Sequence, residues 1–136
     1  MKRRVALILL CGVVLTMAGA RPVVFAHHTV ALTHDISHAV TLTGRITEVQ
    51  WQSPHVLYHL AVPDGKGAVV DWEIESGHLQ GMRRNGVDMD TITVGDTVTM
   101  RVVVALDGSH HAATVSVTLA DGRTLRLCTV TENRCP

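Results

Sequence analysis

The chain has 136 residues, with twelve Lys and Arg, twelve Asp and Glu, and nine His. Four of the cations lie in the first 26 residues, which contain no acid, so the rest of the chain has eight cations against twelve acids and a net charge of −4 with histidines neutral. A mildly acidic chain of this size holds one modest core and is poorly suited to binding nucleic acid or an anionic membrane through bulk electrostatics, which disfavours both kinds of partner.

The N-terminal segment has the pattern of a secretory signal peptide. A basic start at residues 2–4 precedes the uncharged stretch Val5–Gly19, which is too short to span a bilayer comfortably. Cleavage after Ala26 follows the small-residue rule and is favoured over a competing site after Ala20. We therefore predict a signal peptide over 1–26, a periplasmic or secreted mature protein, and no membrane span after processing.

Cleavage after Ala26 would leave a mature chain that begins with two histidines. The α-amine and the imidazole of His27 can chelate a metal as a pair, and His28 can supply a second imidazole. The residues up to Ala39 show no clean period, so we predict an irregular N-terminal arm over 27–39. A solvated chain end is the alternative interpretation of this segment.

Alternating apolar residues predict three strands in the first half of the mature chain. The first covers 40–51 and changes phase near Thr47, as at a bulge that lets a strand curl and serve two edges of a small barrel. The second strand covers 55–62. The third covers 68–74, after the strong turn signal of Pro63–Gly67.

A short helix and two more strands follow. The helix lies within 76–85, with Ser76 as its cap and Gly86 at its end. Further alternation predicts two strands and a short extension, over 98–104, 113–119 and 124–127.

The predicted order of three strands, a helix and two strands is that of an OB-like fold, a partly open five-stranded Greek-key barrel. A plain β-sandwich is the alternative, but five or six strands are few for one. We therefore predict an all-β domain with one short helix over 40–127.

Two cysteines, Cys128 and Cys135, lie beyond the predicted signal peptide. In an oxidising compartment, a disulfide that closes the C-terminal tail 128–136 is the natural interpretation. A metal site built on the two cysteines is the weaker alternative, because their spacing is wider than in common zinc knuckles.

His55 is the best-placed internal histidine. Pairing Val62 with Ala68 across the turn would put His55 and its alternating neighbours on the outer face, opposite the acids of the next strand. This register predicts three opposed pairs: His55 with Glu75, Leu57 with Glu73, and His59 with Asp71. Opposed side chains lie close enough for each histidine to meet an acid. The acid can then orient a metal-ligating imidazole, or the pair can be an ordinary hydrogen bond on a wet surface.

A metal site follows if the mature terminus reaches the second strand. An amine with imidazoles suits copper in tetragonal nitrogen ligation. The predicted ligand set is the His27 amine and imidazole, His28 and His55, with Glu75 as a ligand or as an orienting acid.

The remaining histidines are weaker candidates. His34 and His38 are expected in a solvated loop, His78 on the helix surface, and His110 and His111 in a turn at the barrel rim, as auxiliary ligands at best.

Neither a nucleophile motif nor a Gly-rich phosphate loop is present, so we predict that the protein is not an enzyme. Trp51, Tyr58 and Trp72 are expected in the core, which disfavours a base-stacking platform for single-stranded nucleic acid. A hydrolase that uses Glu73 or Glu75 is a minor alternative, and it would require a concave pocket around those acids.

The chain resembles a family of small secreted bacterial proteins, domain of unknown function 6152. The motifs that carry the resemblance are Ala26-His27-His28, Val40-Thr41-Leu42-Thr43-Gly44, Trp51-Gln52-Ser53-Pro54-His55-Val56, Trp72-Glu73-Ile74-Glu75, Gly86, Gly95-Asp96 and Ser116 through Arg123. The likeness runs from about Ala26 to Leu125. It implies export and gives weight to four residues: His27, His28, His55 and Glu75. It implies no activity.

These observations predict an exported protein that binds a small ligand, with a copper ion as the leading candidate. The alternative is a binding module that uses the face of the second and third strands for a peptide or a saccharide. The two differ in whether His55 serves a metal or a partner molecule.

Overall fold

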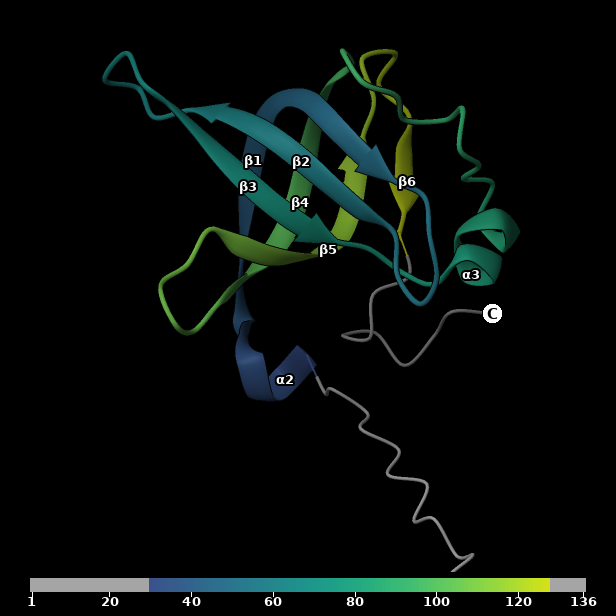
Figure 1. Ribbon diagram of the computed structural model, residues 1–136, viewed down its shortest axis with the longest axis horizontal. Coiled ribbons are helices and arrows are strands. Elements are labelled where there is room, and N and C mark those ends of the chain that lie inside the picture. Colours follow the sequence, from purple (N-terminus) through teal and green to yellow (C-terminus); the bar gives the residue numbers. More distant parts are fainter. Residues whose placement is uncertain (1–29, 128–136) are drawn as a thin grey trace, which may run out of the picture.

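A six-stranded sheet curls into a partly closed ring in the computed structural model, which describes residues 30–127 (Figure 1). The elements in chain order are α2 (Val30–Thr33), β1 (His34–Gln50), β2 (Leu57–Pro63), β3 (Val69–Glu75), α3 (Leu79–Arg84), β4 (Thr97–Ala105), β5 (His111–Thr118) and β6 (Thr124–Arg126). Neighbouring strands follow the order β3-β2-β1-β4-β5-β6, and β3 also pairs with β5. This last pairing joins five strands into an OB-like, partly open barrel, which confirms the predicted fold class.

The long first strand serves two edges of the ring. Residues from Ala39 to Arg45 pair with β4, and residues from Arg45 to Gln50 pair with β2. The register with β2 shifts between Ile46 and Glu48. The predicted phase change near Thr47 is therefore confirmed, and the bulge lets one strand turn from one partner to the other.

The prediction of an irregular arm over 27–39 is wrong for its described residues, because α2 covers Val30–Thr33 and β1 begins at His34. The register with β4 is irregular between His34 and Ala39, and Ile36 stays 53% exposed. Most side chains of this stretch lie in solvent, so it shows no apolar alternation and sequence periodicity missed it.

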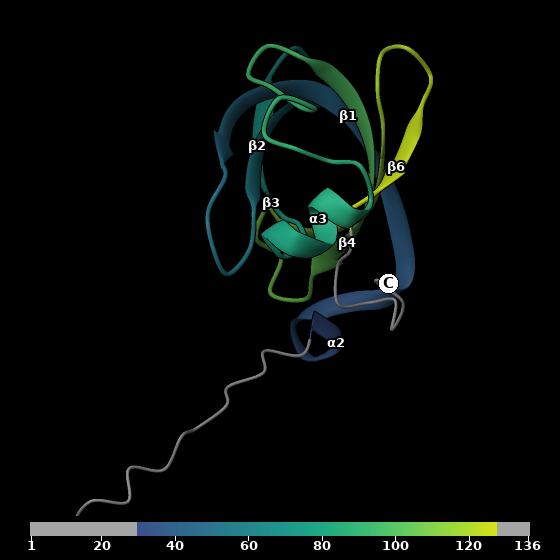
Figure 2. The ribbon, with the colours of Figure 1, turned by 90° about the vertical axis from the view of Figure 1, so that its right-hand side faces the viewer.

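The ring is filled from all sides by apolar side chains. Residues of the strands and loops that are almost completely buried include Ile46, Val56, Tyr58, Leu60, Ile74, Met100 and Val117. Trp51 and Trp72 pack against this core, as predicted. Met82 of α3 belongs to it too, and Figure 2 shows α3 lying across one end of the ring. The apolar face of this short helix therefore covers the core where the strands leave it open.

Strand β5 changes face part-way along, which the sequence did not predict. The alternation that predicts a strand over 113–119 would place Ala113 and Val115 inward, but the residues in the core are Ala112 and Val117. Ala113 belongs instead to a second apolar cluster, with Val30 and Val103, on the opposite surface of the sheet. The cause is a bulge, because the register passes from Arg101–Ser116 to Val102–Thr114 and leaves Val115 without a partner position on β4.

The helix cap also differs from the prediction. Helix α3 begins at Leu79, and its cap is His78, whose Nδ1 accepts a hydrogen bond from the Gly81 N–H at 2.9 Å. Ser76 is buried, and its Oγ lies 2.9 Å from the Thr114 hydroxyl. The serine therefore links the end of β3 to β5 and does not cap the helix. Two more residues follow it before the helix begins at Leu79.

One glycine lets two strands cross closely. A Cβ atom at Gly44 of β1 would lie 2.3 Å from the backbone oxygen of Ala61 in β2. Real Cβ atoms do not approach an oxygen so closely, and a backbone atom in a packed sheet cannot easily move away. Only glycine fits where β1 curls over β2.

Candidate functional site

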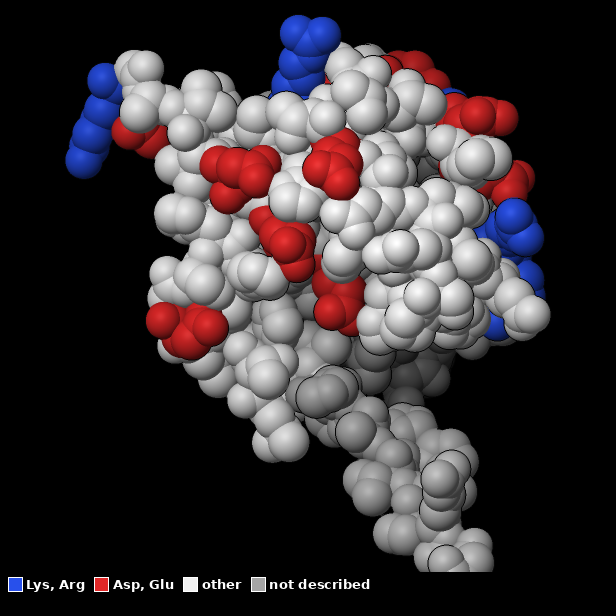
Figure 3. Space-filling model, viewed as in Figure 1, with Lys and Arg blue, Asp and Glu red and all other residues white. Residues whose placement is uncertain are grey.

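The outer surface of β2, β3 and β5 carries three histidine–acid contacts side by side. We call this surface the His–acid face and define it by six residues: His55, His59, Asp71, Glu73, Glu75 and His111. Figure 3 shows acidic side chains gathered over the strands that face the viewer, with basic side chains towards the edges of the view. The face therefore combines imidazole nitrogens with carboxylates, the side-chain groups that ligate transition metals most often.

The contact between His55 and Glu75 is the shortest of the three. His55 Nδ1 lies 2.6 Å from Glu75 Oε1, and the two side chains are 35% and 37% exposed. Backbone bonds between Val56 and the residues just after β3 hold the loop in place: Ser76 N donates to Val56 O at 2.8 Å, and Val56 N donates to Gly77 O at 3.3 Å. The pair is thus anchored on both sides and still accessible from solvent.

The contact geometry favours one of the two predicted roles for Glu75. Because its carboxylate already contacts Nδ1 of His55, it is placed to fix the tautomer and the ring orientation. The Nε2 atom of His55 is then the nitrogen available to a ligand. Glu75 is therefore better placed as an orienting acid than as a direct ligand.

The predicted register between β2 and β3 is wrong by two residues, although both of its predicted His–acid pairs form. Val62 pairs with Val70 rather than with Ala68, so Leu57 lies opposite Glu75 and His59 lies opposite Glu73. His55 and His59 instead reach Glu75 and Asp71 diagonally, at 2.6 and 2.8 Å. Diagonal neighbours on one face of an antiparallel pair are within reach of long side chains.

His59 has the most acidic surroundings on the face. Its hydrogen bond to Asp71 raises its pKa, partial burial opposes that rise, and the charges of Asp71, Glu48 and Glu73 add to it. The His59 and Asp71 side chains are 20% and 60% exposed. The protein therefore favours the imidazolium form of His59 more than an unfolded chain does.

This shift predicts a pH-dependent effect of Asp71→Asn. A raised pKa in the folded state gives stability that is complete below the unfolded value of about 6.5 and is lost as the pH rises through the folded value. The substitution should therefore lower the free energy of unfolding by about 0.5–1 kcal/mol at pH 5.5, the range for a pair whose acid is largely exposed, and by much less at pH 9. Urea unfolding at both values measures this, with Asp90→Asn, an exposed acid outside the face, as the control. An equal loss at both pH values would contradict it.

The third contact crosses from β5 to β3. His111 Nδ1 lies 3.4 Å from Glu73 Oε1, and their side chains are 55% and 35% exposed. The two residues are register partners in the parallel pairing of β3 and β5. His111 was expected in a turn as an auxiliary ligand, but it is the first residue of β5. In an OB-like barrel the third and fifth strands pair with each other, and applying this rule to the predicted strands could have placed His111 beside Glu73.

The side chains of the other described histidines take no part in these three contacts. His38 contacts Asp35 on the exposed part of β1, at 3.1 Å. His78 caps α3, and the His110 ring lies 5.1 Å from the Trp72 ring. His34 and His38 were expected in a loop and lie in β1.

Two of the predicted ligands, His27 and His28, lie outside the described residues, as do Cys128 and Cys135. Within residues 30–127 there is no group of three or more His, Cys, Asp or Glu side chains placed to hold a metal ion. The described chain therefore contributes the His55–Glu75 pair, and any further metal donors of the predicted site would come from outside it.

The point at which the described chain begins is close to this pair. Val30 of α2 belongs to a small apolar cluster with Val103 and Ala113 on the outer surface of the sheet, and Ala113 is the register partner of Glu75. Adjacent strands lie about 4.8 Å apart, and an extended chain covers up to about 3.5 Å per residue. One strand spacing is therefore within the length of two or three extended residues.

The fold and this surface define an OB-like β-barrel whose outer face carries paired histidines and acids. Residues 14–114 match the model of a family described as a family of unknown function (DUF6152), and the chain belongs to that family. None of the curated proteins matches the chain. Across residues 30–127, no helix has the length and apolar character needed to cross a membrane.

Proposed function

We propose that this is an exported protein that binds a copper ion. The proposed site has four members: the His27 amine and imidazole, His28, His55, and Glu75 as the acid that orients His55. The observation that carries the proposal is the 2.6 Å contact between His55 Nδ1 and Glu75 Oε1 at an accessible position. A histidine whose second ring nitrogen contacts a carboxylate is the usual arrangement of a metal-ligating imidazole.

The position of α2 supports the contribution of the N-terminus. Val30 shares an apolar cluster with Ala113, the register partner of Glu75, on the same surface of the sheet. Signal-peptide cleavage after Ala26 would give His27 a free α-amine only three residues before Val30. Two chelating nitrogens on one residue would then be available next to the His55 imidazole.

The donor set favours copper over other divalent ions. An amine with two or three imidazoles suits the tetragonal nitrogen ligation of Cu(II), and Cu(II) binds nitrogen sites more tightly than the other divalent first-row ions do. Calcium and magnesium prefer all-oxygen sites. We further propose a periplasmic or secreted location, a Cys128–Cys135 disulfide, and a role in binding rather than catalysis.

Copper titration of two neighbouring variants tests the role of the acid. Glu75→Gln should weaken Cu(II) binding about 10–100-fold, the usual cost of losing the group that orients a ligating histidine. Glu73→Gln, two residues away on the same face and in contact with His111, is the matched control and should change the affinity by less than about threefold. Competition against a chelator of known affinity measures both. Equal effects of the two variants would contradict the proposed site.

A further inference from the structure

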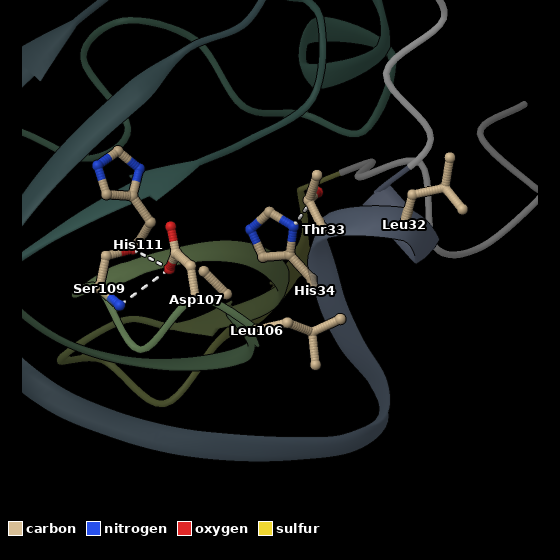
Figure 4. A pocket seen from close by; sticks show the side chains of 8 residues that line it. Leu32, Thr33, His34, Leu106, Asp107, Ser109 and His111 are labelled. Atoms are coloured by element: carbon tan, nitrogen blue, oxygen red, sulfur yellow. Dashed lines mark hydrogen bonds between the residues drawn. The ribbon is translucent and has the colours of Figure 1, made fainter.

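A cavity of about 470 Å³ lies between α2 and the turn that joins β4 to β5. Figure 4 shows that its walls come from two distant parts of the chain, with Thr33 and His34 on one side and Asp107, Ser109 and His111 on the other. A backbone hydrogen bond from Leu106 N to Thr33 O, at 2.9 Å, holds these two parts together. The volume is within the range of small-molecule sites.

Aliphatic side chains form one part of the lining. Leu32 and Leu106 are 79% and 65% exposed, and both line this cavity together with Ala105. An apolar group in the cavity would shield both of these aliphatic side chains from water, which is favourable. A ligand of this cavity therefore needs an apolar body.

The polar part of the lining has an anion and no fixed cation. Asp107 Oδ1 accepts hydrogen bonds from Ser109 N at 2.9 Å and Ser109 Oγ at 2.6 Å, and these bonds lower the pKa of Asp107. No described residue that lines the cavity is Lys or Arg. The His34 ring is held by its neighbour, with Nδ1 2.8 Å from Thr33 Oγ1. The polar part of the lining therefore favours a ligand that carries a positive charge and donates hydrogen bonds.

We propose that this cavity binds a small organic amine with an apolar body, with the ammonium group near Asp107 and the body between Leu32 and Leu106. An organic anion is disfavoured, because it would meet the Asp107 carboxylate with no Lys or Arg in the described lining to balance it. The proposal does not depend on copper. None of the lining residues belongs to the proposed metal site.

Phenethylamine and phenethyl alcohol are suitable probes, because they share the same body and differ in charge. The processed full chain is titrated with each at neutral pH, with EDTA present to remove metal, while methyl NMR signals are followed. We expect saturable shifts of the Leu32 and Leu106 methyl groups, with the amine bound about three- to fivefold more tightly than the alcohol, as for an accessible charge pair. Equal affinities would overturn the proposal, and so would shifts centred elsewhere or no saturable shift up to about 10 mM.

Two acid variants separate the local charge from the net charge. Asp107→Asn retains the oxygen that Ser109 contacts, so the turn should persist while the amine affinity falls to that of the alcohol. Asp64→Asn makes the same change in another turn, where the carboxylate accepts from Lys66 N at 2.7 Å, and should leave the amine affinity unchanged. An equal loss in both variants would show an effect of net charge alone and would overturn the proposed site.

Discussion

Acetylating the α-amine of a chain that begins at His27 is expected to weaken Cu(II) binding roughly 100-fold, since it removes one metal donor outright and costs at least as much as losing an orienting group. Acetylation removes the charge and the basicity of the amine but leaves every side chain unchanged. The His55–Glu75 pair and the imidazoles of His27 and His28 would remain. Competition titration gives the affinity, and electron paramagnetic resonance of the Cu(II) form reports the loss of a nitrogen donor.

The way in which the α-amine is modified matters for this experiment. Adding one residue in front of His27 would place His28 at position three, where an amine, two backbone amides and an imidazole can form a different copper site. Acetylation avoids this complication. Equal affinities of the free and acetylated chains would remove the amine from the site, and an exported protein whose mass corresponds to a start at Arg21 would remove the proposed His27 terminus altogether.

Gly44→Ala is expected to produce the largest loss of stability among simple substitutions in β1. The new Cβ would lie 2.3 Å from the Ala61 carbonyl oxygen and 2.9 Å from the Ala61 carbonyl carbon, both of them backbone atoms. Relieving this overlap requires β1 and β2 to separate where their backbones are in close contact, so the free energy of unfolding should fall by about 3 kcal/mol or more. In a domain of this size, that lowers the melting temperature by roughly 12 °C or more.

Thr41→Ala is the matched control, because Thr41 lies on the same strand and its side chain is exposed. Its effect on the free energy of unfolding should be within about 0.5 kcal/mol. Thermal and urea unfolding of both variants are followed by circular dichroism. If the Gly44→Ala variant has the same melting temperature as the parent protein, then β1 does not cross β2 as closely as the structure indicates.

The sequence predicted the strands with a clean alternation of apolar residues. Val56, Tyr58 and Leu60 alternate without interruption and are all fully buried, so β2 was assigned to the correct face. The phase change near Thr47 was also visible, because a charged residue follows it and Val49 then resumes the apolar position. Gly44 indicated a strand position but not the crossing that makes glycine necessary there.

The bulge in β5 could not be predicted in the same way. Residues 112 to 115 are Ala, Ala, Thr and Val, so either phase places small or apolar side chains inward. The choice is made by tertiary contacts, since Val30 and Val103 cover Ala113 from outside the ring. The extra residue of a bulge can be recognised in a sequence only where it interrupts the alternation of apolar and polar side chains.

The register error between β2 and β3 arose in the turn. The prediction placed the turn over Pro63–Gly67, whereas Pro63 remains in β2 and pairs with Val69. Asp64 stabilises the shifted turn, with its carboxylate accepting from Lys66 N at 2.7 Å and Ala68 N at 3.0 Å. Moving the centre of a turn by one residue shifts every pair by two positions and therefore retains the face of each side chain. For this reason the histidines and acids met even though the register was wrong.

The parallel pairing of β3 with β5 has a further consequence for ligand binding. It comprises three register pairs, Glu73–His111, Ile74–Ala112 and Glu75–Ala113, whereas the pairing of β2 with β3 comprises seven. A short strand pairing that completes a partly closed ring is a place where local opening costs little. A ligand bound by groups on both β3 and β5 would hold the two strands together. Hydrogen exchange of the amides in this pairing should then slow upon binding, while the exchange rates of the other strands stay the same.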